Sequence, residues 1–415
     1  MERSQPSVAK IHLFQSVDNL SLLLLFIFVV LIPFEFATKL PDGKTILFFL
    51  GIILAFLFLL KISFNGFRIK INKLPIFLLF LWLGWAAFSI FWAEDTGRSI
   101  IRIIDIFEGL LFVIIFIDLI TSEKKMKIVL NTFYFSTVIV SLYLIFSGKI
   151  FSFDRVVLIE GENPNFFGRN IAIGFLIGLF YLTQNKNISV KIVHIINITF
   201  LSAVIIRLFS RGIWLALGAS LLFSFLFYFK RIFGDRKNLV LFPLILSIIV
   251  ILSTSLLSEW GLRRIERTFI KDERLTYGTR RIEVWSVAAK MYLEHPIIGV
   301  GVNNFFNTFP DYIYSEEIEK KLRDTDLEGK DAHNVFIGIL CELGIIGIIP
   351  FTIFLAAIFI QIRRIKNHKF SLLAFMIFVF IFISFFFNTI QYRKFFYFSN
   401  ALFVAIPMIS NKKNG

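Results

Sequence analysis

Long apolar runs alternate with short polar segments over most of the chain. Each of twelve runs comes close to the ~20 residues that a helix needs to cross ~30 Å of hydrocarbon. We therefore predict twelve transmembrane helices. In chain order they cover Leu20–Ala37, Thr45–Ile62, Leu74–Trp92, Ile101–Ile120, Ile128–Phe146, Phe166–Thr183, Ile192–Phe209, Ile213–Phe229, Leu239–Leu257, Val335–Ile360, Leu372–Phe387 and Phe395–Ile409.

The polar segments between these runs differ in charge. Lysine and arginine gather in alternate loops, and the positive-inside rule assigns such loops to the cytoplasm. Both termini are then cytoplasmic, and the long segment 259–333 faces outward as a helical loop domain. We thus divide the chain into 1–258 with helices one to nine, the loop domain 259–333, and 334–415 with helices ten to twelve. The basic loops contain Lys61, Arg68, Lys70 and Lys73; Lys124, Lys125 and Lys127; Lys186 and Lys191; Lys230, Arg231, Arg236 and Lys237; and Arg363, Arg364, Lys366 and Lys369.

Composition agrees with this picture and narrows the function. Of 415 residues, 57% are hydrophobic and 18% are charged, too apolar for a soluble chain of this length. We therefore predict an all-α, polytopic membrane protein that contacts membrane lipids. The net charge of +15 lies in loops that set topology, so it does not indicate a nucleic-acid partner.

We also expect no metal and no cofactor. The sequence has no nucleotide-phosphate loop and no His/Cys cluster with metal-ligand spacing. The pair in Asp324-Thr325-Asp326 has the spacing of a metal motif, but carboxylates in an acidic loop are more often simply solvated.

One histidine stands where chemistry is plausible. His333 comes immediately before the tenth apolar run. It is either an interfacial histidine that caps a helix, or a proton acceptor or hydrogen-bonding group, since its ordinary pKa lies near neutrality.

Arginines and asparagines also mark helix ends on the predicted outer side. Arg211 lies in the turn between the seventh and eighth runs. It either snorkels to anchor a helix end or grips a diphosphate through paired hydrogen bonds that lysine cannot reproduce. Asn163 and Asn165 flank a proline at the start of the sixth run, as helix caps or beside an entrance for a lipid phosphate. Arg169 follows one turn inside, where a charge is costly without a partner.

Several motifs occur together in one order. His333-Asn334 is followed after nine residues by Gly344 and after two more by Gly347. Glu342 lies two positions before Gly344. This pattern resembles the signature of the O-antigen ligase and O-antigen polymerase superfamily, membrane glycosyltransferases that use undecaprenyl-diphosphate-linked glycans. Four further motifs are similar to parts of that family: Asn163-Pro164-Asn165, Ser210-Arg211-Gly212, Arg281-Ile282-Glu283-Val284-Trp285 and His295-Pro296-Ile297-Ile298-Gly299-Val300-Gly301.

The resemblance implies a GT-C-like enzyme of the inner membrane whose active site faces the periplasm. As a ligase of lipopolysaccharide biosynthesis, it would transfer glycan from undecaprenyl diphosphate to a sugar hydroxyl of lipid A-core, with inversion and without a divalent ion. His333 would take or orient the acceptor proton, while Arg211 and Arg281 stabilise the departing diphosphate. The further candidates for binding diphosphate or glycan are Arg280 (an alternative to Arg281), Arg169, Asn163, Asn165, Asn334 and Glu342.

Two alternatives remain open. The first is a polymerase of the same superfamily, which joins one carrier-linked repeat to another. The second is a polysaccharide transporter or flippase. Transporters usually contain repeated halves with broken helices near the midplane, and no such repeat is evident in the sequence.

Overall fold

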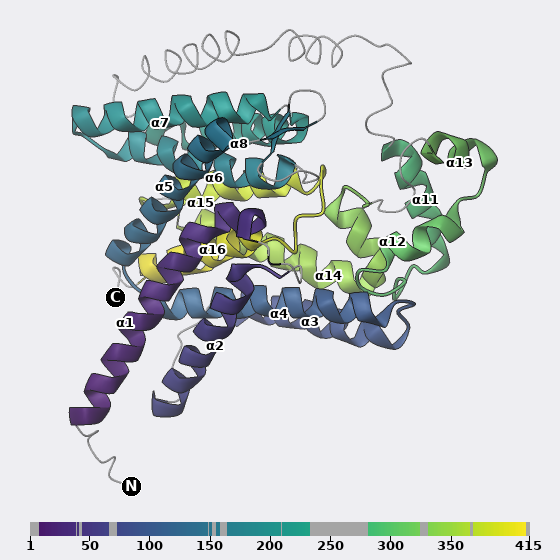
Figure 1. The fold of residues 1–415 in the computed structure, drawn as a ribbon, viewed down its shortest axis with the longest axis horizontal. Coiled ribbons are helices and arrows are strands. Elements are labelled where there is room, and N and C mark those ends of the chain that lie inside the picture. The colour runs from purple at the N-terminus through teal and green to yellow at the C-terminus, as the bar shows by residue number, and fades with distance from the viewer. Residues whose placement is uncertain are drawn as a thin grey trace.

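The computed structural model describes residues 8–38, 40, 44–65, 73–147, 149–151, 155–157, 164–208, 210–232, 281–323, 331–365 and 368–411. Within these ranges the fold is helical apart from one short hairpin (Figure 1), which confirms the predicted all-α class. The hairpin pairs β1 (Lys149–Phe151) with β2 (Arg155–Val157) in antiparallel register, Ile150 opposite Val156. The helices are α1 (Val8–Leu31), η1 (Ile32–Thr38), α2 (Ile46–Asn65), α3 (Lys73–Phe88), η2 (Ser89–Phe91), α4 (Thr96–Leu119), α5 (Glu123–Ser147), α6 (Pro164–Gln184), α7 (Ile188–Arg207), α8 (Arg211–Ile232), α11 (Arg281–Glu294), α12 (Phe305–Thr308), η5 (Phe309–Tyr312), α13 (Glu316–Arg323), α14 (Val335–Arg364), α15 (Ser371–Ser384) and α16 (Lys394–Asn411).

Eight helical segments among the described residues are long and apolar enough to cross a membrane. They correspond to α1, α2, α3, α5, α6, α7, α8 and α14, so the chain is a multi-pass membrane protein. The predicted eleventh and twelfth spans are the shorter apolar helices α15 and α16. The predicted ninth span, Leu239–Leu257, lies outside the described residues.

The predicted fourth span coincides with α4, which carries more charge than the other spans. One of its charges, Glu108, is largely covered and contacts Lys394 of α16 at 2.6 Å. Another, Asp118, is also largely covered and contacts Lys61 of α2 at 2.6 Å. Such a pair is tolerated inside a bundle because each charge satisfies the other. Glu108 and Asp118 of α4 therefore face protein and not lipid.

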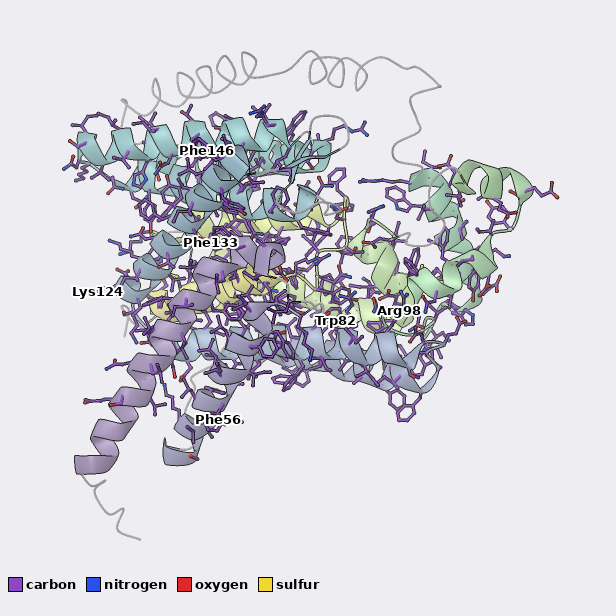
Figure 2. All side chains as sticks on the ribbon, viewed as in Figure 1. Phe56, Trp82, Arg98, Lys124, Phe133 and Phe146 are labelled. Carbon is purple, nitrogen blue, oxygen red and sulfur yellow. The ribbon has the colours of Figure 1, made fainter. Side chains whose placement is uncertain are left out.

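The bundle has a protein-facing interior and an apolar exterior. Of the membrane-spanning residues of α6, 89% are buried, whereas of those of α2 only 22% are buried. Therefore α6 is central in the bundle and α2 lies at its edge. Trp82 and Phe133 are completely covered, whereas Phe56 and Phe146 project outward (Figure 2). Large exposed apolar side chains on outer helices are what a lipid environment requires.

The two ends of the bundle carry different groups. The helices α11, α12 and α13 gather at one end, while α1 begins and α16 ends toward the other (Figure 1). Arg98 lies at the first end and Lys124 at the second (Figure 2). We call these the Arg98 end and the Lys124 end. Two of the predicted basic loops meet at the Lys124 end, because Glu123 contacts His368 and Lys369.

Candidate active site at the Arg98 end

The described part of 281–333 has a small apolar core of its own. Val287, Met291 and Phe309 are buried there with other side chains of α11, α12 and η5. Two hydrogen bonds fasten this cluster to the start of α14: the Trp285 indole donates to the Ala332 carbonyl at 2.9 Å, and the Cys341 thiol donates to the Ala288 carbonyl at 3.2 Å. This core and these two hydrogen bonds fix the position of α11 relative to the start of α14.

Two glycine-containing motifs meet backbone to backbone. The amide of Val300 donates to the Cys341 carbonyl at 2.9 Å, and the amide of Ile345 donates to the Pro296 carbonyl at 2.9 Å. Gly344 interrupts α14 with φ 62° and ψ −164°, a conformation essentially restricted to glycine. Trp85 of α3 donates to the Leu343 carbonyl at 2.9 Å, which satisfies a group freed by this break.

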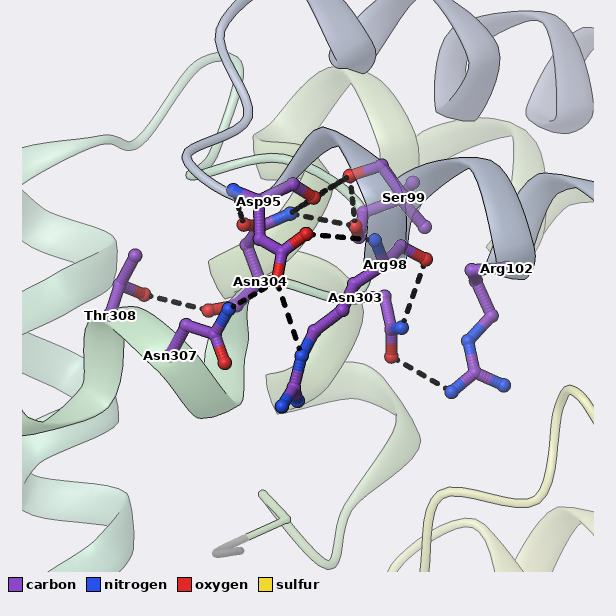
Figure 3. Close-up of polar contacts among 9 residues, drawn as sticks. Asp95, Arg98, Ser99, Arg102, Asn303, Asn304, Asn307 and Thr308 are labelled. Atoms are coloured by element: carbon purple, nitrogen blue, oxygen red, sulfur yellow. Dashed lines mark hydrogen bonds and ion pairs between the residues drawn. The ribbon is translucent and has the colours of Figure 1, made fainter. Parts of the chain in front are cut away.

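A polar network attaches the following loop to the start of α4 (Figure 3). The side-chain oxygen of Asn304 accepts from the Asp95 amide at 2.7 Å, and its nitrogen donates to the Ser99 hydroxyl at 2.9 Å. Arg102 donates to the Asn303 side chain at 2.8 Å. Buried side-chain hydrogen-bond networks of this kind make the backbone that they connect rigid. The loop is thus held between α4 and α14.

His333 is positioned by its backbone conformation and by Asp331, which Thr389 contacts in turn. Its φ of 48° is left-handed, a conformation in which histidine is over-represented among side-chain-bearing residues. The His333 amide donates to the Asp331 carboxylate at 3.4 Å, and the Thr389 hydroxyl donates to the other carboxylate oxygen. The next residue, Asn334, caps α14 by accepting from the amides of Phe336 and Ile337.

Asn388 joins His333 to Arg169. Its terminal amide lies 3.2 Å from His333 Nδ1. The amide orientation that satisfies all partners turns its oxygen toward the two terminal Arg169 nitrogens, at 3.0 and 2.8 Å. Its nitrogen then donates to His333 Nδ1 and, at 2.7 Å, to the Phe387 carbonyl. Nδ1 of the neutral ring is therefore an acceptor, and Nε2 carries the proton.

Arg169 is buried, with 1% of its surface exposed. Besides the contacts with Asn388, it donates to the Asn165 carbonyl at 2.8 Å, one turn earlier in α6. The contact uses the backbone of Asn165 and not its side chain. The partner that a deep charge needs is thus Asn388, a residue that the sequence analysis missed.

Arg281 and Arg211 approach the same loop from two helix starts. Arg281 donates to the Phe387 carbonyl at 3.1 Å, and its guanidinium lies over the Phe387 ring. A Cβ at Gly212, next to Arg211 in α8, would lie 2.9 Å from Phe387. Arg211 itself is exposed, and its positive charge acts on Arg281.

The site is rich in positive potential. The N-termini of α6, α8, α11 and α14 converge on Phe387 and Asn388, and each contributes roughly half a positive charge. Burial lowers the pKa of His333; Asp331 raises it and Arg281 lowers it further, so the ring is neutral at pH 7. Burial has the opposite effect on the carboxyl group of Asp331 and raises its pKa. Helix N-termini with arginines form a receptor for an anion such as a diphosphate.

The other predicted residues lie at the edge of this group or outside the described part. Glu342 is buried and accepts from the Tyr392 hydroxyl at 3.3 Å, with Arg102 stacked on the Tyr392 ring at 4.0 Å; the described contacts do not join it to His333. Asn163, Arg280 and Asp324-Thr325-Asp326 fall outside the described residues. In the described ranges, no three His, Cys, Asp or Glu side chains are arranged to hold a metal ion.

Sequence reasoning also missed three groups: Asn388 and Thr389 in the α15–α16 loop, and Asp331 two residues before His333. The predicted eleventh span ran to Phe387, but α15 ends at Ser384. Phe385 to Phe387 belong to the loop instead, because their backbone supports Val335 and Arg281.

Comparison with known proteins agrees with the geometry. A model of the family described as O-antigen ligase matches residues 196–352, which include Arg211, Arg281, His333 and both glycine motifs. No curated protein matches the chain. Proteins of this family are membrane glycosyltransferase-like enzymes, ligases or polymerases, with lipid-linked glycan substrates. The match shows that residues 196–352 are similar to the O-antigen ligase family, whose superfamily contains ligases and polymerases.

Proposed function

We propose that the protein is an O-antigen ligase of the inner membrane. It transfers glycan from undecaprenyl diphosphate to a sugar hydroxyl of lipid A-core at the periplasmic face. The convergence of four helix N-termini with Arg169, Arg211 and Arg281 beside His333 carries the proposal. A diphosphate leaving group requires this concentration of positive charge.

In the proposed reaction the acceptor hydroxyl oxygen attacks the anomeric carbon of the carrier-linked sugar. The bond from this carbon to the diphosphate oxygen breaks, and its electron pair leaves with the diphosphate. The departing diphosphate takes up the hydroxyl proton. Direct displacement inverts the anomeric carbon and uses no divalent ion.

We assign His333 the orienting role and not that of proton acceptor. With Asn388 donating to Nδ1, the free side of the neutral ring is the Nε2 proton. This proton can hold the acceptor oxygen or an oxygen of the diphosphate. Donors preorganised at a developing charge are a large source of rate enhancement.

Arg281→Ala is expected to lower transfer at least tenfold, because one donor to the transition-state charge is worth ~2.7–4 kcal/mol. Arg211→Ala should act similarly, and Arg211→Lys should recover only part of the loss, because ammonium cannot form the paired contact. Release of undecaprenyl diphosphate from reconstituted vesicles measures the rate. Wild-type rates in a folded variant remove that arginine from the mechanism. Arg98→Ala, at the same end but paired with Asp95, is the matched control.

Asn388→Leu is expected to lower transfer about tenfold or more, since it removes the two contacts of the buried Arg169 guanidinium with Asn388, leaves it only the Asn165 carbonyl, and frees the His333 ring. Asn388→Asp should keep the contacts with Arg169 while losing the donor to Nδ1. The two variants separate support of Arg169 from orientation of His333. Equal activity of Asn388→Leu and wild type contradicts the positioning role.

Product analysis in a deletion strain distinguishes the superfamily activities. A ligase defect removes lipid-A-attached polymer while long carrier-linked chains accumulate. A polymerase defect leaves surface glycan limited to single repeats. Conversion of a carrier-linked glycan by purified protein without an ion gradient excludes a transporter.

The proposed orientation places the Arg98 end outside the cell and the Lys124 end, with both termini, in the cytoplasm. It rests on the basic loops at the Lys124 end. Cysteine introduced at Arg98 should react with an impermeant reagent on intact spheroplasts, and cysteine at Lys124 should not. The opposite result reverses the proposed sidedness and rules out a periplasmic site.

A further inference from the structure

A cavity opens at the Lys124 end, away from His333. It has a volume of about 590 Å³ and lies between α5, α6, α7 and the turn that precedes α15. This size is typical of small-molecule sites. The mechanism proposed above uses none of its residues.

One wall of this cavity is built to meet an anion. Lys127 and Lys369 line it together with the side-chain amides of Asn131 and Asn185. The Asn185 amide nitrogen donates to the Tyr181 carbonyl at 2.9 Å and lies 3.4 Å from Nε2 of His194, which is buried at the cavity wall. Ammonium and amide groups are donors, and a phosphate offers several acceptor oxygens.

The charge around the cavity is also positive in sum. Lys369 pairs with Glu123, which also contacts His368 at 3.1 Å, so this lysine is partly neutralised. Further lysines, however, lie close to the lining residues in the sequence. Glu123 is the one acidic residue in the segments 123–135, 180–194 and 369–370 that contain the lining residues. The flanking lysines are Lys124, Lys125, Lys186 and Lys191.

Another part of the wall is apolar and exposed on membrane-spanning helices. Phe135 of α5 and Val193 of α7 line the cavity and are about half exposed, at 47% and 49%. Both belong to membrane-spanning helices. A soluble anion gains nothing from such a wall, whereas an acyl chain can lie along it.

We propose that this cavity binds the phosphate headgroup of an anionic phospholipid from the leaflet at the Lys124 end. Lys127 and Lys369 contact the phosphate, the amide of Asn131 contacts a headgroup oxygen, and an acyl chain lies along Phe135 and Val193. Basic pockets between transmembrane helices recognise anionic headgroups in this way. The site is separate from the proposed active site and in the other leaflet, so it stands whether or not the chain is a ligase.

Native mass spectrometry of the detergent-purified full chain tests this proposal. The probes are phosphatidylglycerol, phosphatidylcholine and soluble glycerol 3-phosphate. We expect wild type to retain phosphatidylglycerol at least about tenfold better than phosphatidylcholine, a difference of ~1.4 kcal/mol. Lys127→Glu should abolish this preference. Lys124→Gln, an exposed lysine one turn earlier that does not line the cavity, should preserve it.

A second variant tests the site without changing charge. Val193→Trp fills the apolar side of the cavity and should lower phosphatidylglycerol retention about tenfold while both lysines remain. Retention equal to wild type in folded Lys127→Glu or Val193→Trp overturns the proposal. Binding of glycerol 3-phosphate without preference for the lipid overturns the assignment to a phospholipid.

Discussion

Replacing His333 by alanine is expected to lower glycan transfer by about 10²- to 10³-fold, the usual loss when one preorganised donor is removed. The reason is geometric: Asn388 occupies Nδ1, so the Nε2 proton is the group that His333 offers to a ligand. Donor binding should change much less, because the arginines remain. Transfer of labelled glycan to acceptor lipid in proteoliposomes, with carrier-lipid binding measured separately, checks both expectations.

Two further substitutions make this result specific. His333→Gln places an amide N–H near the position of Nε2 but cannot accept a proton at neutral pH. It should therefore keep a measurable part of the activity if His333 is a hydrogen-bond donor, and none if it is a base. His295→Ala is the matched control, because His295 is exposed and precedes the glycine motif without contacting Asn388. Complete inactivity of His333→Gln in a folded protein contradicts the donor assignment.

The pH dependence provides an independent readout. Protonation of Nδ1 turns it into a donor that faces the Asn388 nitrogen, so activity should fall as the ring becomes charged. Burial holds the pKa of His333 below its ordinary value, so the loss occurs at a pH below ~6.5. Asp331 raises this pKa, and Asp331→Asn should therefore move the loss to still lower pH.

Eight of the twelve spans were predictable because the requirement is local: a run of apolar residues must lie in lipid or in the interior of the bundle. The fourth predicted span is the helix α4, which contains Glu108 and is not among those eight. The sequence does not reveal which residue pairs with each buried charge. Glu108 pairs with Lys394, which is 286 positions later in the chain. Arg169 contacts Asn388, which is 219 positions later.

The candidate site could be assembled from the sequence only in part, for a similar reason. His333, Arg211 and Arg281 occur in motifs that a family pattern singles out. His333 and Arg281 contact the α15–α16 loop, and the charge of Arg211 acts on Arg281. Asn388 carries no such signal, because a single asparagine after an apolar run reads as the end of a helix. Its role arises only when the α15–α16 loop meets α6 and the start of α14. Asn334, predicted to contact substrate, has its side-chain oxygen engaged in capping α14.

Gly344→Ala is expected to cost at least ~2–4 kcal/mol of stability, the largest effect that we predict for a single methyl group. The backbone at Gly344 has φ 62° and ψ −164°, which alanine adopts only with strain. A Cβ there would also overlap the carbonyl oxygen of Ile297. The chain would have to separate the two motifs and lose the hydrogen bond from Ile345 to Pro296.

Thermal unfolding in detergent, followed by tryptophan fluorescence, measures the change. Gly338→Ala is the matched control in the same helix: its Cβ would meet its nearest neighbour at 3.5 Å, an ordinary contact, and alanine favours helix over glycine. We expect Gly338→Ala to unfold at or above the wild-type temperature, and Gly344→Ala well below it. Because the motif contact holds α11 against α14, any folded Gly344→Ala should also have lost most transfer activity. Wild-type stability of Gly344→Ala would mean that α14 is not broken at this residue, and the placement of His333 and Arg281 that depends on the break would be wrong with it.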